Sequence, residues 1–181
     1  MLHERFLEAG TRLLAISIDS PERNAAMVEK LLLPFAYLSD PDRTAVIGPY
    51  GLADPKDVRN IALPAVVLVT PAAEEAFRFV SRDFAERLPE EKILDQAVNL
   101  GLPPTTQARP LTANSQPGPR SLSAEQLRIY YRGARFAALA MGLRHAHFSD
   151  EIKNDSKAYV AEMDRYTAAI EQLMSRPPHS M

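Results

Sequence analysis

The chain has 181 residues, of which 46% are hydrophobic and 24% are charged. This composition is typical of a globular protein and excludes a chain that is disordered throughout. The length suits one domain of ordinary size with an appendage. The formal net charge is -2, so there is no general positive field to hold a phosphate backbone, and we expect no nucleic-acid partner.

The chain contains no cysteine. This excludes disulfides, thiolate zinc sites and a cysteine nucleophile. The first residues mix charged and apolar side chains and do not resemble a signal peptide. No window approaches the roughly 20 apolar residues that span a bilayer. We therefore expect a cytoplasmic protein without a membrane partner.

The first forty residues alternate between helical and strand patterns. Residues 1–9 resemble the end of a helix that Gly10 terminates. Residues 12–19 form a nearly continuous apolar run, which predicts a parallel strand covered on both faces. A helix should follow Ser20 and end before Pro34, because Pro21 and Glu22 suit a first helical turn. Residues 35–39 predict a second strand.

The next sixty residues complete an α/β layout. We expect a helix over residues 44–50 and a loop over residues 51–55. Residues 65–69 contain three valines and give the clearest strand signal. Residues 76–80 alternate as a half-exposed antiparallel strand would. A last helix should begin at Pro89 and stop at Gly101, so the order ends in a hairpin and a helix.

The remaining chain changes character twice. Residues 102–120 hold five prolines among threonine, glutamine, serine and asparagine without apolar periodicity, which indicates a linker. Ser123 with Gln126 forms a capping box for a helix, and Ser149 or Asp150 can cap a second one. These helices predict an antiparallel hairpin. Its expected interface follows the seven-residue repeat: Leu127, Tyr131, Ala134, Ala138, Met141, Tyr159, Met163, Tyr166 and Ile170.

The sequence thus predicts a domain over residues 1–101, a linker over 102–120 and a helical hairpin over 121–176. A two-helix hairpin alone buries little area. We therefore expect it to contact the first domain or a second copy of itself, and a homodimer is one expected assembly.

Four stretches carry a family resemblance: "LLAISIDSPE", "LPFAYLSDPDRTAVIGPYGL", "ALPAVVLVTP" and "FRFVSRDFAERLPEEKIL". In order and spacing, residues 1–101 resemble the peroxiredoxin family, which comprises the alkyl hydroperoxide reductases and thiol-specific antioxidants (AhpC/TSA) of the thioredoxin fold. The resemblance implies an incomplete thioredoxin-like sheet with flanking helices. It also implies that Pro64 holds the position of the family's active-site proline, commonly cis, so we expect a cis bond there.

The same resemblance implies that two family features are missing. The family's first strand and the helix start with its cysteine would lie before Met1. Without a thiolate, sulfenic acid chemistry cannot run. The missing strand is central, so the strands near residues 13–18 and 65–69 would each lose a partner. They could close on each other, a partner could fill the gap, or the true protein could start earlier. The family's activating arginine is also not evident, since Leu63 precedes Pro64.

Other candidate sites have weaker support. Asp19, Asp40 and Asp54 each end an element and could converge at the carboxyl edge of the sheet, although capping and turn roles are favoured. His145 and His147 would point apart on a helix, which disfavours metal binding. No phosphate loop, catalytic triad signature or zinc spacing is present. We expect no metal and no cofactor.

Two functions of different classes follow. The first is a thiol-dependent antioxidant oxidoreductase that is inactive as given, as a truncated or a degenerate family member. Truncation is favoured, because a start-site error loses a strand more easily than a stable design does. A full-length form would reduce a peroxide or protein disulfide with a thioredoxin-like electron donor. The alternative is a non-catalytic interaction module, whose oligomer should be lost when Ala134 and Ala138 become Glu.

Overall fold

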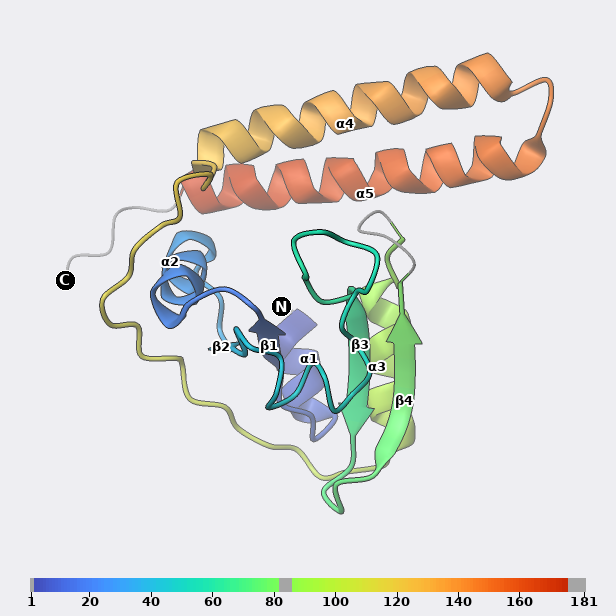
Figure 1. Cartoon of the computed structure of the whole chain (residues 1–181). Helices are drawn as coiled ribbons and strands as arrows, with labels where there is room; N and C mark the ends of the chain where they lie inside the picture. The colour runs from blue at the N-terminus through green and yellow to red at the C-terminus, as the bar shows by residue number, and fades with distance from the viewer. Residues whose placement is uncertain (1, 82–85, 176–181) are drawn as a thin grey trace. The chain divides into compact units, whose positions relative to one another are not determined.

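In a computed structural model of the chain, residues 2–81 and 86–175 are described (Figure 1). They form two compact units, Met1–Pro117 and Gly118–Met181. The first unit combines helices with short strands and the second holds a pair of helices. This confirms the α/β fold class with a C-terminal helical hairpin. The finer division into a domain, a linker and a hairpin stays a prediction.

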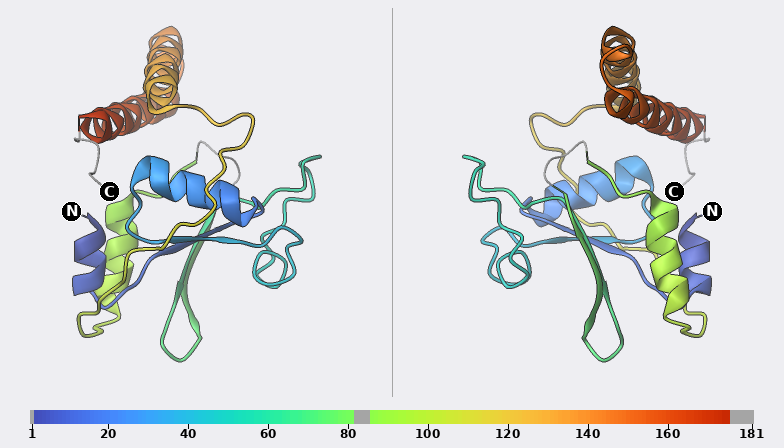
Figure 2. Two further views of the ribbon diagram at one scale, coloured as in Figure 1. Left: turned by 90° about the vertical axis from the view of Figure 1, so that its left-hand side faces the viewer. Right: turned by 90° about the vertical axis from the view of Figure 1, so that its right-hand side faces the viewer.

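The core of the first unit lies between α1 (Leu2–Glu8) and α3 (Glu90–Asn99). These helices lie side by side (Figure 2), and Phe6, Leu94 and Ala97 are buried between them. Gly10 ends the turn after α1 with a φ of 72°. A Cβ at Gly10 would also collide with residues 102 and 103. Both the backbone angle and the close approach therefore require glycine.

The expected parallel strand pair is present. β1 (Leu14–Ser17) pairs in parallel with β2 (Ala36–Ser39), and α2 (Pro21–Leu31) connects them. Pro21 occupies the first helical turn after Ser20, as predicted. The helix ends at Leu32, which adopts a left-handed conformation with a φ of 50°. This βαβ unit brings the carboxyl ends of β1 and β2 to one edge.

The second strand pair forms a sheet of its own and is not paired with the first. β3 (Ala65–Val69) and β4 (Glu75–Val80) form an antiparallel hairpin (Figure 1). Among the described residues the strands form two separate two-stranded sheets. β1 therefore does not pair with β3. This pairing was one of the expected ways to fill the gap left by the missing strand. Each of these strands has one edge without a partner strand in the described part of the chain.

The prediction of a helix over residues 44–50 is wrong. This segment forms consecutive turns instead. The amides of Ala45, Val46 and Ile47 donate to the carboxylate of Asp40 at 2.8–3.1 Å. Arg43 adopts a φ of 64°, which breaks a right-handed helix. The side chain of Asp40 thus replaces the helical carbonyl acceptors that the sequence pattern implied.

Residues 102–117 contain no helix or strand, as expected, but they are bonded to the rest of the first unit. The amide of Thr105 donates to Leu7. The side chain of Gln107 accepts from the Leu13 amide at 3.0 Å and donates to its carbonyl. Further along, the amide of Gln116 donates to Glu22 at 3.0 Å. This segment is therefore held along the first unit by hydrogen bonds.

The second unit is an antiparallel hairpin of α4 (Ala124–His145) and α5 (Asp150–Met174) (Figure 1). The predicted capping box is present, with Ser123 accepting from the amide of Gln126 while the Gln126 side chain accepts from Ser123. Ser149 caps α5. In the described part of the chain, no helix combines the length and apolarity needed to cross a membrane.

Candidate functional site

The carboxyl edge of the β1–β2 pair is the candidate site, because ligands of α/β folds collect where parallel strands end. Asp19 follows β1 and Asp40 follows β2. The amide of Asp40 donates to the Ser17 carbonyl at 2.8 Å. The structure therefore brings two of the three predicted aspartates to one edge.

Asn24 of α2 organises this edge. It is only 3% exposed. Its amide nitrogen donates to the Leu38 carbonyl and to the Ser39 hydroxyl, each at 3.0 Å. Its oxygen accepts from the Ser17 hydroxyl at 3.0 Å. Because a buried amide is costly unless its groups are bonded, this network joins the helix to both strands.

Asp40 is buried, and its carboxylate accepts from three backbone amides. These hydrogen bonds, the one from Ile47 above all, hold the pKa of Asp40 below its ordinary value. The carboxylate is therefore committed to the turn over residues 45–47. It performs the turn role that the sequence favoured.

Asp19 is an accessible acid of this edge, and its charge acts on Tyr37 of β2. The Asp19 carboxylate is about half exposed and lies 3.6 Å from Arg23. Burial raises the pKa of the Tyr37 hydroxyl, and the negative charge of Asp19 raises it further, while Arg87 opposes the shift. Tyr37 therefore stays protonated at neutral pH and can donate a hydrogen bond, but it is no nucleophile there.

Asp54 lies on the loop that precedes β3. Its amide donates to Ile61 at 2.9 Å, and its carboxylate accepts from the Lys56 amide. In the same loop, Asp57 accepts from the guanidinium of Arg59 at 2.6 Å. This ion pair lowers the pKa of Asp57 to about 2. The charge of Arg59 is therefore balanced within its own loop.

Pro64 precedes β3, and its carbonyl accepts from the Ser81 amide at 2.8 Å. No peptide bond in residues 2–81 or 86–175 is cis. The prediction of a cis bond at Pro64 is therefore wrong. The amide of Leu63 donates to Leu52 at 2.7 Å, so hydrogen bonds on both sides of Pro64 hold an extended chain, which a trans proline at the start of a strand accommodates.

The predicted hairpin residues lie mostly between α4 and α5. The rings of Tyr131 and Tyr166 are 5.3 Å apart. The Ser156 hydroxyl donates to the carbonyl of Ala138 at 2.6 Å. Arg135 and Asp164 form an ion pair at 2.6 Å. Met163 and Ile170 are buried. These contacts form one seam that holds the two helices together.

Met141 is the exception, since it is 51% exposed. Gly142 is buried in its place and would collide with Ser156 if it carried a Cβ. The seam advances by four residues from Ala138 to Gly142, because a straight helix has 3.6 residues per turn rather than 3.5. The seven-residue repeat therefore predicted Met141 at a position of the interface that Gly142 occupies.

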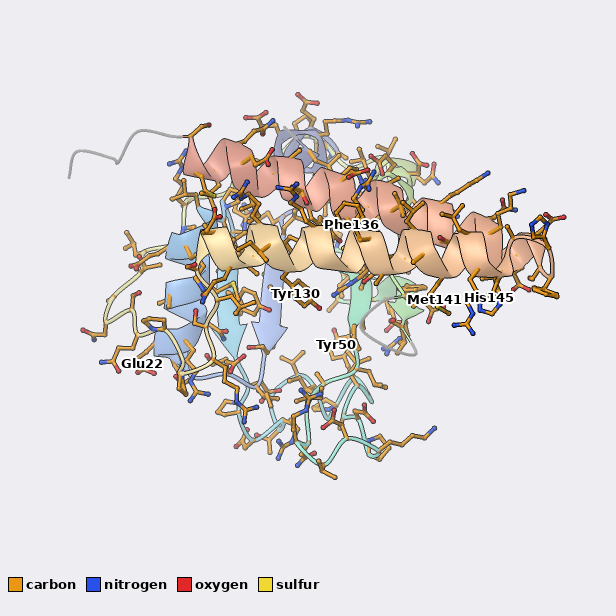
Figure 3. The ribbon with its side chains drawn as sticks, turned by 90° about the horizontal axis from the view of Figure 1, so that it is seen from above. Glu22, Tyr50, Tyr130, Phe136, Met141 and His145 are labelled. Carbon is orange, nitrogen blue, oxygen red and sulfur yellow. The ribbon has the colours of Figure 1, made fainter. Side chains whose placement is uncertain are left out.

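Sequence reasoning also missed the apolar residues on the exposed side of α4. Ile129, Phe136 and Leu143 are 60%, 58% and 68% exposed. Tyr130, Phe136 and Met141 are labelled along this helix in Figure 3. A second seven-residue repeat over residues 129, 133, 136, 140 and 143 could have revealed this face.

The chemistry available at the candidate edge is hydrogen bonding and charge pairing. The hydroxyl of Ser17 is bonded to Asn24, and the whole chain has no thiol. In the described ranges no three histidine, aspartate or glutamate side chains gather as a metal site would require. The edge is thus a fold-stabilising network, and the half-exposed acid Asp19 lies beside it.

Two comparisons with known proteins bear on this chain. Residues 1–74 match the family described as the AhpC/TSA family. The match covers α1, the β1–β2 pair and the loop up to β3. A search of curated proteins found no match.

Proposed function

Because residues 1–74 match the model of the AhpC/TSA family, we propose that this chain is a thioredoxin-like antioxidant-type domain whose own residues perform no thiol chemistry. The observation that carries the proposal is the lack of any cysteine in 181 residues. The thiolate is the nucleophile in peroxide reduction and in thiol-disulfide exchange. Neither serine nor methionine supplies an equivalent group at neutral pH.

The geometry of the candidate edge supports this proposal. A serine would need an adjacent base to act as a nucleophile. Ser17 instead donates to the amide oxygen of Asn24, which is not a base. Ser39 accepts from the same side chain at 3.0 Å. The hydroxyl groups at this edge therefore stabilise the fold.

Peroxide or disulfide reduction would require a cysteine supplied from outside residues 1–181. In that case the substrate would be a peroxide or a protein disulfide and the electron donor a thioredoxin-like protein. The proposed location is the cytoplasm.

The test is a peroxide-consumption assay of the purified 181-residue chain with thioredoxin, thioredoxin reductase and NADPH. We expect NADPH oxidation no faster than in the reaction without the chain. A turnover that scales with the concentration of the chain would overturn the proposal. A cysteine-containing peroxiredoxin serves as the positive control for the coupled system.

A second experiment asks whether a cysteine accompanies the chain in its native cell. The intact mass and the free thiol count of the native protein are measured together. A mass of 20.1 kDa without a thiol supports a domain that works without thiol chemistry. A larger mass with a thiol assigns the residues described above to the scaffold of an oxidoreductase.

A second candidate function is a non-catalytic interaction module, and the exposed apolar side chains of α4 favour it. Ile129, Phe136 and Leu143 are each more than half exposed. Large apolar side chains gathered on one helix face are typical of interaction surfaces. Sedimentation velocity over a concentration series tests this function. One defined complex supports it, whereas a broad distribution of sizes indicates unspecific association through strand edges.

A further inference from the structure

α4 has two apolar faces. Its inner face contacts α5 through the seam described above. On the opposite side, Ile129, Gly133, Phe136, Ala140 and Leu143 repeat at spacings of four and three, and all five are exposed. We name these five residues the outer seam. A surface helix with a single partner normally has a polar outer face. The outer seam has the spacing of a helix-helix contact instead.

The surroundings of the outer seam are poor in charge. Leu139 and Ala137 border it and are exposed as well. The charged residues nearest to it are Arg132 and Arg144, with Glu125 at the start of the helix. Such a face disfavours a strongly acidic or basic partner and favours another apolar helix.

The two glycines of α4 provide an independent observation. Gly142 is explained by α5, because a Cβ there would collide with Ser156. At Gly133 a Cβ would meet no atom within 4 Å. Glycine inside a helix is unfavourable compared with alanine, and the hairpin itself gives no reason for it at this position. A second helix that approaches the outer seam closely would give one.

We propose that the outer seam is a self-association surface, on which α4 of a second copy lies antiparallel with Phe136 against Phe136. This inference rests on the interaction role proposed for the hairpin and names its partner. In this arrangement Ile129 of one copy lies opposite Leu143 of the other. Such a pairing is a two-fold contact, in which both copies use the same residues.

Residue size agrees with self-pairing. In an antiparallel contact each Phe136 enters the space between Gly133, Ala137 and Ala140 of the second copy. These three residues are small, so the large ring finds room as a knob in a hole. The larger residues Ile129 and Leu143 meet each other at the two ends of the contact. At the centre the two Phe136 rings therefore lie beside each other, and each packs over small residues of the second copy.

The arginines of α4 favour an antiparallel over a parallel orientation of the second helix. A parallel arrangement in register would place Arg132 beside Arg132 and Arg144 beside Arg144, and like charges repel. In the antiparallel arrangement Arg132 lies level with Ala140 of the second copy. Arg144 lies level with Arg128, whose charge is paired with Glu125 of its own helix. Glu125 accepts from Arg128 at 3.0 Å. The antiparallel arrangement thus separates the two Arg132 side chains, and the arginine that lies level with Arg144 already has an acidic partner.

The area of the surface fits a reversible dimer. At about 150–250 Å² for a large side chain, the exposed fractions of Ile129, Phe136, Leu139 and Leu143 and the small residues between them correspond to on the order of 500 Å² per copy. The pair would bury about 1,000 Å², which is near the lower limit for a specific interface. We therefore expect a dimer that dissociates on dilution.

The first test uses the lack of native thiols, which makes introduced cysteines unambiguous. Ile129→Cys and Leu143→Cys proteins are mixed under mild oxidation, and each is also oxidised alone. We expect the mixed disulfide, identified by its intact mass, as the main product, because only the antiparallel arrangement brings these positions within disulfide reach. Cross-linking of each variant with itself would overturn the antiparallel arrangement. No cross-linking at all would overturn the surface.

The second test is sedimentation equilibrium over a concentration series. We expect an association of the wild-type chain that Phe136→Glu abolishes. Ala161→Glu is the matched control, because Ala161 is an exposed apolar residue on α5 outside the outer seam. Gly133→Ala should raise the dissociation constant by about tenfold, and it does not weaken the helix. A wild-type chain that stays monomeric, or an association unaffected by Phe136→Glu, would overturn the proposal.

The outcomes separate this inference from the broader interaction role. A defined complex that resists Phe136→Glu and shows no 129–143 cross-link would keep the interaction role and overturn the outer seam as its surface. Far-UV circular dichroism of every variant controls for folding, and Gly133→Ala keeps the test decisive if Phe136→Glu does not fold.

Discussion

At the scale of residues, polar side chains of the first unit bond backbone groups in place of a neighbouring strand or helix. Asp40 and Asn24 are each 3% exposed, and both are bonded to backbone groups. Gln107 bonds both polar groups of Leu13. Each of these side chains bonds backbone amides or carbonyls that would otherwise need a partner in a strand or helix. Substituting them should therefore change the local backbone and not only a contact.

Asp40→Asn tests this role and its dependence on pH. The new amide group would direct a donor at the amides of residues 45–47, so we expect the unfolding temperature at pH 7 to fall by about 5 °C. The pKa of Asp40 is lowered in the folded chain. Its stabilisation is therefore complete above the unfolded pKa of about 3.9 and is lost as the pH falls through the folded pKa.

The difference between the wild type and Asp40→Asn should thus shrink below about pH 4. Thermal unfolding followed by circular dichroism between pH 2 and pH 7 measures it. Asp95→Asn is the control, because Asp95 is an exposed aspartate on α3 and does not belong to this turn. A gap between the two proteins that stays constant with pH would contradict the assigned role of the carboxylate.

At the scale of elements, the hairpin helices have well-defined beginnings. Ser123 takes part in a reciprocal capping box, whereas Ser149 caps α5 with a single bond to the Ile152 amide at 3.2 Å. We expect Ser123→Ala to cost about 1 kcal/mol of unfolding free energy. Urea unfolding measures the change, with the exposed Gln172→Ala on α5 as the control. An unchanged midpoint for Ser123→Ala would show that the cap does not contribute.

The edge of β1 provides a second prediction for an element. The Ser17 carbonyl accepts from the amide of Asp40 on the β2 side. Alternate residues of a strand direct their polar groups to opposite edges, so the amides of Leu14 and Ile16 face away from β2. We expect these two amides to exchange with deuterium faster than those of Ala15 and Ser17. Equal protection along β1, measured by NMR, would indicate a partner on the other edge.

At the scale of the whole molecule, the chain has two compact units. We therefore predict that a substitution that destabilises one unit leaves the stability of the other unchanged. Gly142→Ala should destabilise the hairpin, because the added methyl group collides with Ser156, at a cost of about 1–3 kcal/mol. Gly133→Ala is the matched substitution in open space. At concentrations where the chain is monomeric, it should stabilise α4 by up to about 1 kcal/mol.

Hydrogen exchange with peptide-level mass spectrometry measures the local stability of both units in one experiment. We expect Gly142→Ala to accelerate exchange in α4 and α5 while exchange in β3 and β4 stays unchanged. Accelerated exchange in β3 and β4 would show that the units unfold together. The same substitution at two positions of one helix thus has opposite expected effects on the hairpin, because only one position faces α5.

The sequence alone determined what local pattern and chemistry decide. Short apolar runs placed the first three strands, alternation of apolar and polar residues placed the fourth, and Ser123 with Gln126 marked the start of α4. The lack of cysteine excluded thiol chemistry by the chain itself. These features depend on residues that are neighbours in sequence or on composition, so no distant contact was needed to predict them.

Only the tertiary structure decided which partner each group takes. Asp40 replaced a predicted helix with turns because its carboxylate lies within reach of three amides. The chain around Pro64 is extended between two hydrogen-bonded neighbours. Gly142 rather than Met141 faces α5, because the pitch of the helix drifts from the seven-residue repeat. Long-range contacts and helix geometry set these outcomes, and neither can be read from residue type alone.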